Sequence, residues 1–496
     1  MNLSHLAIAV TTSVLLTACG GDSSSGDDAV NIDNVRKVVE TNADIAFAAY
    51  SDSVTTAEAL RDALADFRAD PSEANLTAAK DSWLVAREPY GQTEVYRFRL
   101  SPIDSTDYSS EDGLEGDINA WPLGEALIDY VKVNTTDFGD DQIGVTGNGA
   151  GVNGGGAVDS DNFDDTDPKT NIIGNTAITI DADLLSNTAT ADDEHDVIAG
   201  YHAIEFLLWG QDLNDEAGTT DGTDRDEAVK THDASNLATG GQRLFTDFVP
   251  GYDGTTVTYD SSELTHRRHK YLEVAVEKLI ADLTSVRDGW AEGATYRTAF
   301  TTVETEADAE QRMTEILTGM GTLSEGELAG ERMQIAFSAN SQEDEHSCFS
   351  DNTHRDIWLN AEGVSNSYYG EYAGYDSTLN GSDDVTTNAV SGYGIDDYLT
   401  DAGESVLKTQ IEAALTLTET NYGEIDSEAR GGSPFDVQVM TENLSATSPV
   451  AKTILSLNAQ SKIIANIADN LGLDGSTVVD IDASGCDTED PTATCD

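Results

Sequence analysis

Basic residues are scarce in this chain of 496 residues. Lys and Arg number 26 against 92 Asp and Glu, giving a formal net charge of −66 at pH 7. Such a surface repels phosphate backbones, which excludes nucleic acid as a partner, and it disfavours docking on anionic lipid headgroups. The acids are spread along the whole length, which is typical of a surface solvated in salty water or of one that collects cations. Because salt weakens repulsion among like charges, we expect the fold to gain stability with ionic strength.

Long apolar runs are also lacking, and the one near the N-terminus is too short to span a bilayer. It leads into Leu16-Thr17-Ala18-Cys19, which has the form of a lipoprotein signal-peptidase box. Residues 1–18 are therefore predicted to be a removed signal peptide, with Cys19 lipidated and residues 19–30 forming a flexible tether to the membrane. Gly20 after the lipidated Cys favours the outer membrane. A plain secretory signal, which would deliver the chain to the periplasm, is the alternative.

Cysteine is rare, with four residues of which three remain after Cys19. Cys486 and Cys495 lie close together in the polar tail 476–496, and an exported protein folds in an oxidising compartment. The spacing predicts a small disulfide between them. Cys348 stays outside this pair, and its role is left open.

Alternating strand patterns are scarce, and helical periodicity dominates. Residues 171–181 are the one clear strand candidate, and residues 136–168 are a Gly/Asn/Asp-rich insertion without the pattern of a calcium loop. The sequence predicts an all-α protein of two helical bundles, residues 31–300 and 301–475, joined by long acidic and glycine-rich loops. Apolar positions recur at helical spacing over residues 31–69, 72–99, 191–210, 263–290, 305–341, 398–422 and 444–471.

Three polar clusters interrupt the apolar helices, and the first is GYHAIEFLLWG at residues 200–210. His202 and Glu205 share one face of a helix that is apolar nearly all round and is therefore buried. A buried ionised carboxylate needs an arginine, a proton or a metal. Gly200 would allow close approach of a ligand or of another backbone. A His–Glu pair satisfied by protein neighbours is the alternative.

The second cluster is WLVAREPYGQTEVYRF at residues 83–98. A helix would place Trp83, Arg87, Tyr90 and Glu94 on one stripe, with Pro89 interrupting it. We expect this helix to contact the His202 helix, with Arg87 compensating a buried carboxylate such as Glu205. Glu94 is a candidate metal ligand, and a structural Arg87–Glu94 pair within the helix is the alternative.

The third cluster, EDEHSCFSDNTHRD at residues 343–356, follows an apolar helix end. Its density of histidine and acid predicts a site loop, in which Glu345, His346 and His354 are candidate ligands and Asp351 and Cys348 support them. A solvated acidic loop is the alternative.

These clusters, in this order, resemble the imelysin-like family and, within it, the iron-regulated protein A group. The resemblance rests on G-x-H-x-x-E at Gly200, His202 and Glu205, on AREPYGQTEVYRF followed by SPID and INAWPL, and on EHSCFSDNTHRDI. It implies two related helical bundles with the site at their junction, export to the cell envelope, and a link to iron uptake or iron limitation. The family is classed with peptidases.

The residues themselves favour metal binding over hydrolysis. The chain has no HExxH, Phe206 stands where an inverzincin has its second histidine, and G-x-S-x-G is missing, so an enzymatic activity is left open. Histidine with carboxylates suits iron, and zinc is a further option. Binding is expected to strengthen between about pH 5 and 7.5 as His202 loses its proton.

The sequence thus favours a lipid-anchored envelope protein of iron acquisition. Its partners would be iron-uptake or haem-related envelope proteins. A metallopeptidase of the imelysin class and a surface module for a protein or haem ligand are the alternatives. The predicted metal ligands between the two bundles are Glu94, His202, Glu205, Glu345, His346 and His354, supported by Arg87, Tyr90, Gly200, Cys348 and Asp351.

Overall fold

A computed structural model describes nine segments of the chain. The predicted signal, Cys19, residues 20–29 of the predicted tether and the insertion 136–168 lie outside them. Among the described helices, none combines the length and apolar character needed to cross a membrane. The described residues are 30–129, 172–174, 178–186, 197–210, 243–249, 261–339, 344–439, 445–479 and 485–495.

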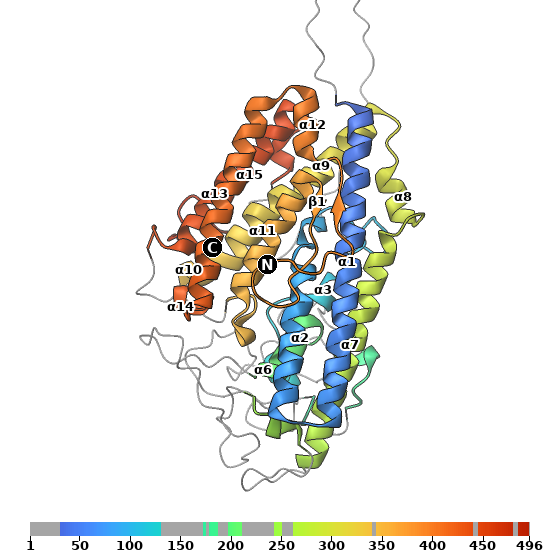
Figure 1. The fold of residues 1–496 in the computed structure, drawn as a ribbon, viewed down its shortest axis with the longest axis vertical. Helices are drawn as coiled ribbons and strands as arrows, with labels where there is room; N and C mark the ends of the chain where they lie inside the picture. The colour runs from blue at the N-terminus through green and yellow to red at the C-terminus, as the bar shows by residue number, and fades with distance from the viewer. Residues whose placement is uncertain are drawn as a thin grey trace, which may run out of the picture.

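Three long helices form the N-terminal part of the molecule (Figure 1). α1 (Ile32–Ala69) packs against both α2 (Glu73–Gly91) and α7 (Ser261–Gly289). The Asp70-Pro71 turn separates α1 from α2, and Ser72 caps α2 by accepting from the backbone N–H of Asn75. α6 (Gly200–Trp209) packs between α2 and α7.

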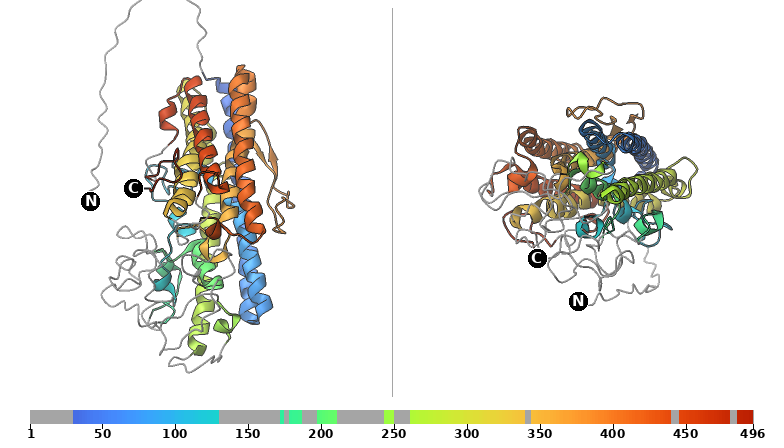
Figure 2. Two further views of the ribbon diagram at one scale, coloured as in Figure 1. Left: turned by 90° about the vertical axis from the view of Figure 1, so that its left-hand side faces the viewer. Right: turned by 90° about the horizontal axis from the view of Figure 1, so that it is seen from below.

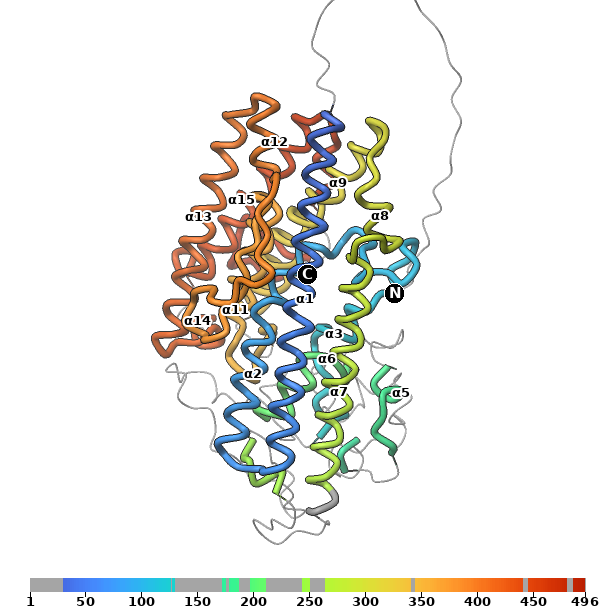
Figure 3. The backbone as a smooth tube through the Cα atoms, turned by 45° about the vertical axis from the view of Figure 1, so that its right-hand side comes forward, coloured from blue at the N-terminus to red at the C-terminus, as the bar shows by residue number. Residues whose placement is uncertain are grey.

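The C-terminal helices form a second packed group. α13 (Ser405–Arg430) and α15 (Pro449–Asn470) run side by side, as the side view also shows (Figure 2). Their apolar faces share a core with the helix that begins at Leu323. The tube view separates these orange and red helices from the blue α1 and α2 (Figure 3).

α11 (Thr353–Tyr369) connects the two groups. It contacts α2 on one side and α13 on the other. The hairpin of β1 (Glu371–Tyr372) and β2 (Val390–Ser391), which follows α11, packs on α1. Elements that follow residue 301 thus contact helices that precede residue 300. Packing alone does not mark a boundary there, and the division into residues 31–300 and 301–475 stays a prediction.

The helix predicted over residues 305–341 has three parts. α9 (Glu306–Thr322) runs directly into a π-helix, η4 (Leu323–Gln334), and α10 (Ile335–Ala339) follows. In a π-helix each N–H bonds to the carbonyl five residues back, and such segments are rare and frequently found at functional sites. The apolar spacing of an α-helix does not reveal this change of register.

The strand predicted over residues 171–181 is wrong in the part that is described. Residues 172–174 form a turn, and the N–H groups of Ile172 and Ile173 donate to Leu127 and Ile128. Both isoleucines are buried by packing against the end of α4 (Glu125–Ile128), which explains their apolar character without a strand.

Short elements complete the fold. Near the site they are η1 (Glu94–Tyr96), α3 (Glu115–Ile118) and η5 (Cys348–Ser350). The remainder are α5 (Ala182–Leu185), η3 (Phe245–Phe248), α8 (Thr295–Thr301), α12 (Ile395–Ala402), α14 (Phe435–Val439) and η6 (Gly475–Thr477).

Candidate functional site

His202 and Glu205 lie on α6 with both side chains fully buried. The Nδ1 atom of His202 is 2.9 Å from Oε2 of Glu205. The other carboxyl oxygen, Oε1, accepts from the backbone N–H of Ser350 at 3.0 Å and from its hydroxyl at 2.6 Å. Glu205 therefore orients the His202 ring and joins α6 to the third cluster.

His346 is the second imidazole of the site. Its ring meets that of His202 edge-on, with the centroids 4.6 Å apart. Its Nδ1 atom lies 2.8 Å from Oδ2 of Asp356, and its Nε2 atom lies 3.4 Å from Nδ2 of Asn119. Each imidazole is thus held at Nδ1 by a carboxyl group.

The orientation of the Asn119 amide fixes the tautomer of His346. Its Oδ1 atom accepts from Arg87, and its Nδ2 atom donates to Glu94 at 3.2 Å. The amide nitrogen therefore faces His346 and donates to Nε2, while Nδ1 donates to Asp356. His346 carries its lone pair on Nε2.

Arg87 compensates a buried carboxylate, although not the one we expected. Its guanidinium lies 3.0 Å from Asp356, and both side chains are 1% exposed. The expected contact between α2 and α6 is present, since Trp83 donates to the carbonyl of Tyr201 at 2.9 Å. The correction concerns the partner: Asp356 on α11 takes the position that the sequence suggested for Glu205.

Glu94 lies in an arginine network. α2 contains Pro89 and ends at Gly91, so Glu94 belongs to η1 and not to the predicted α2 stripe. Its carboxylate pairs with Arg97 at 3.1 Å and with Arg332 at 3.3 Å. Burial opposes its charge, but Arg332 and Arg97 outweigh that effect and hold the pKa of Glu94 below its ordinary value. Glu94 has counter-charges without a metal.

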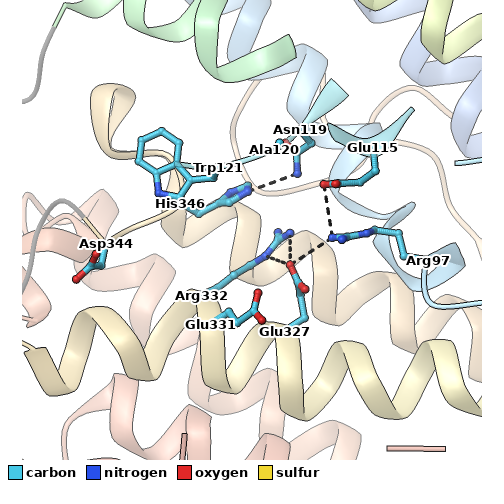
Figure 4. A pocket seen from close by; sticks show the side chains of 10 residues that line it. All are labelled: Arg97, Glu115, Asn119, Ala120, Trp121, Glu327, Glu331, Arg332, Asp344 and His346. Atoms are coloured by element: carbon cyan, nitrogen blue, oxygen red, sulfur yellow. Dashed lines mark hydrogen bonds and ion pairs between the residues drawn. The ribbon is translucent and has the colours of Figure 1, made fainter. Parts of the chain in front are cut away.

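A cavity of about 190 Å³ adjoins these residues. Figure 4 shows His346 on one side and Glu327 and Arg332 from η4 on the other. Glu327 accepts from both Arg332 and Arg97. The lining residues are Arg97, Glu115, Asn119, Ala120, Trp121, Glu327, Glu331, Arg332, Asp344 and His346.

Burial sets the protonation of the two imidazoles. It lowers the pKa of His202 well below its ordinary value, with His346 and Arg87 adding to the effect, and lowers that of His346 to about 4. Burial therefore favours the neutral form of His202, and the expected gain in metal binding on its deprotonation stays a prediction. Burial also raises the pKa of Glu205 to about 8.

The remaining predicted residues lie around this centre. Glu345 is fully buried and groups with Asp351 and Asp436, one ligand atom from each lying within 4.8 Å of the others. His354 lies on α11, where Nδ1 is 2.9 Å from the carbonyl of Asp351 and Nε2 is 3.7 Å from Asp426. None of its described contacts is with His202 or His346.

Two further predicted residues are part of the packed interior. Tyr90 is fully buried, and its ring lies 5.0 Å from that of Tyr201 on α6. Cys348 is buried in η5 and is not in a disulfide. Both support the positions of α2, α6 and the 344–352 loop.

Sequence reasoning missed several residues of the site. Ser350 and Asp356 stand inside the third cluster but received no role, and Arg332 lies on a helix that read as ordinary core. Asn119 and Trp121 belong to the string INAWPL, and the Trp121 ring lies 5.0 Å from that of His202. The segments AREPY, INAWPL, GYHAIEF and EHSCFSDNTHRD all contribute side chains to this site. The sequence analysis had already singled out these four segments, and that was the signal from which Asn119, Trp121, Ser350 and Asp356 could have been found.

A model of one known protein family matches most of this chain. The family model described as imelysin, peptidase M75, matches residues 46–464. The chain belongs to the imelysin family. Its G-x-H-x-x-E motif is the α6 segment that carries Gly200, His202 and Glu205.

The chain is also similar to individual proteins, over a short stretch or at low identity. Iron-regulated protein A of Synechococcus elongatus is 38% identical over 64 residues, which is 13% of this chain and 16% of that relative. A Parabacteroides distasonis structure, assigned as an iron-regulated protein A precursor, aligns over 90% of this chain and 96% of its own at 17% identity, with a TM-score of 0.52. An imelysin-like protein of Psychrobacter arcticum aligns at 12% identity over 90% and 98%, with a TM-score of 0.48. The Parabacteroides structure supports the helical fold.

Proposed function

We propose that this imelysin binds iron through the imidazoles of His202 and His346 and acts in iron acquisition at the cell envelope. The name of the Synechococcus relative supports the link to iron. The two rings are neutral, in contact and buried, which is the state in which histidine serves as a metal ligand.

The observation that carries the proposal is the Nε2 atom of His202. It is buried and has no hydrogen-bond partner among the described residues. Buried polar atoms are nearly always hydrogen-bonded, so an exception points to a ligand or a functional role. Metal-binding histidines usually have the other ring nitrogen held by a carboxylate, and Glu205 and Asp356 hold Nδ1 of His202 and of His346.

The size and charge of the cavity favour an ion over haem. Pockets for drug-sized organic ligands measure roughly 300–1,000 Å³, and this cavity of about 190 Å³ is smaller. Its lining contains four carboxyl groups and two arginines. A hydrated cation suits this balance, whereas the propionates of haem would add negative charge.

Two imidazoles do not complete the coordination of iron, which favours additional oxygen ligands. Glu345 precedes His346 in the chain, and its group with Asp351 and Asp436 is a source of such oxygens within the same loop region. Water in the cavity is another. When bound, iron would supply a redox-active or Lewis-acidic centre.

The test is isothermal titration of ferrous iron, under anaerobic conditions, into wild type and single variants. We expect His202→Ala and His346→Ala each to lower affinity at least about 100-fold, since each removes a ligand. Glu205→Gln and Asp356→Asn should lower it by about 10- to 100-fold, as loss of an orienting carboxylate does. The matched control is His266→Ala, which removes an exposed histidine on α7 and should leave affinity unchanged.

Equal affinity in wild type and in both alanine variants would reject the imidazole pair. Loss of affinity in His202→Ala alone would assign the site to the G-x-H-x-x-E helix without His346. Casein digestion by iron- or zinc-loaded protein, abolished by His202→Ala, would favour the peptidase alternative.

We also propose that Cys19 carries lipid and anchors the protein in the outer membrane. The support is the Leu-Thr-Ala-Cys box with the Gly/Ser/Asp segment after it. Wild type should fractionate with membranes and take up labelled palmitate, whereas Cys19→Ser should do neither. Firm membrane association of Cys19→Ser would contradict the proposal.

A further inference from the structure

The disulfide-closed C-terminal loop is attached to the π-helix η4. Cys486 and Cys495 form a disulfide, the pair that the sequence predicts. Within the loop, the hydroxyl of Thr488 donates to Glu325 at 3.0 Å. The side-chain amide of Gln334 donates toward three loop carbonyls, those of Asp487, Asp490 and Ala493, at 3.0, 3.2 and 3.1 Å.

These two attachments lie on one face only if the helix is a π-helix. Glu325 and Gln334 are nine residues apart. An α-helix turns by about 100° per residue, which would place them on opposite sides of the helix. A π-helix, with bonds five residues back, turns by about 82° per residue, which brings them to within roughly 20° of one another. The loop therefore matches the π register and not the α register.

The opposite face of η4 points into the cavity. Glu327 and Arg332 are five residues apart, so a π-helix separates them by about 50° and an α-helix by about 140°. They are in contact, with Nη2 of Arg332 3.0 Å from the Glu327 carboxylate. Glu331 also lines this face (Figure 4). The charges next to His346 thus depend on the same register that the loop fits.

We infer that the Cys486–Cys495 loop holds residues 323–334 in the π register and so keeps Glu327 and Arg332 in position beside His346. The attachments are buried: Glu325 and Gln334 are 6% and 0% exposed, and Thr488 is 4% exposed. Closing the loop with a disulfide restricts the conformations in which Thr488 and the three carbonyls could move apart. α15 adds a further contact, since Asn458 donates to Glu325 at 2.8 Å.

Hydrogen–deuterium exchange tests the register directly, without any metal. In Cys486→Ser/Cys495→Ser we expect the amides of residues 323–334 to exchange at least about tenfold faster than in wild type, because the π-helix opens more often. Exchange in α1 and α7 should not change. Gln334→Leu and Thr488→Val, which keep the disulfide, should each show a smaller acceleration in the same segment.

The control is Glu489→Gln in the same loop, where the carboxylate meets Lys462 at the surface and not η4. Its exchange pattern should match wild type. Unchanged exchange of residues 323–334 in the double serine variant and in both single variants would overturn the inference. Should the double variant not fold, the single variants decide, since the disulfide remains in them.

The consequence for the cavity rests on the proposed function and is measured separately. If wild type binds ferrous iron, the double serine variant should bind it about tenfold more weakly, as loss of an orienting shell does. Wild type that binds no iron would reject the proposed function and leave the exchange result as the test of the loop. If the double serine variant shows faster exchange of residues 323–334 but unchanged iron affinity, the loop stabilises the π-helix without affecting the cavity.

Discussion

Replacing Arg87 by methionine is expected to lower the free energy of unfolding by about 3–5 kcal/mol, the usual cost of leaving one partner of a buried ion pair alone. Asp356 would keep its charge in the interior, where it is 1% exposed. Burial disfavours that charge, yet Arg87, His346 and Ser347 hold the pKa of Asp356 well below its ordinary value. Urea denaturation of the metal-free protein measures the change.

Two further variants separate the charge from the lost packing. Arg87→Met/Asp356→Asn removes both charges and should recover a large part of the loss, since no unpaired ion remains. Arg61→Met makes the same substitution in an exposed pair with Asp62 and should leave stability nearly unchanged. A double variant as unstable as Arg87→Met would show that the arginine acts by packing and not by compensating Asp356.

In the metal-free protein the Glu205 carboxyl group is expected to lower the free energy of unfolding as pH rises from about 4.5 to about 8, and Glu205→Gln should remove this contribution. Burial raises the pKa of Glu205 from 4.5 to about 8. In this interval the unfolded chain ionises the carboxyl group while the folded protein keeps the proton, so each pH unit costs up to about 1.4 kcal/mol. The contribution is complete below pH 4.5 and absent above pH 8.

Thermal unfolding with a chelator present, at pH 5.5 and pH 8.5, checks this sign. Relative to wild type, Glu205→Gln should be more stable at pH 8.5 than it is at pH 5.5. The groups facing the carboxyl, which are His202, Ser350, Asp356 and Arg87, are the same in both proteins. Glu58→Gln, at an exposed position on α1, is the control and should follow wild type at both pH values. A parallel course for Glu205→Gln and wild type would contradict the raised pKa.

The sequence predicted the helices and the candidate site better than it predicted which buried charges pair with one another. α6 was readable because apolar residues surround His202 and Glu205 and Gly210 follows the last turn. Arg87 plainly needed a carboxylate, but Asp356 stands 269 positions away in the chain. That carboxylate also lies in the first turn of α11, within a cluster that read as a loop. Long-range pairing of this kind depends on how α2 and α11 pack, which periodicity does not encode.

The π-helix was out of reach for a different reason. Residues 323–334 keep enough apolar spacing to read as an α-helix, and the change to bonds five residues back shifts which side chains align. In an α-helix Glu327 and Arg332 would lie about 140° apart, so the sequence did not predict that they form a pair. Only the backbone shows that both face the cavity, and this register also decides what the C-terminal loop can contact.

The glycine at position 200 has a consequence for how related sequences are recognised. Gly200 has φ +77°, and a Cβ atom there would clash with the carbonyl oxygen of Ile118. Ile118 directly precedes Asn119, whose amide meets His346, so close backbone contact at Gly200 sets how near the His202 helix lies to the other imidazole. The H-x-x-E spacing alone, which only places two side chains on one face of a helix, does not require this contact. A database pattern limited to H-x-x-E would therefore collect false positives, whereas requiring the glycine two positions before the histidine selects for chains able to bring two separate imidazoles together.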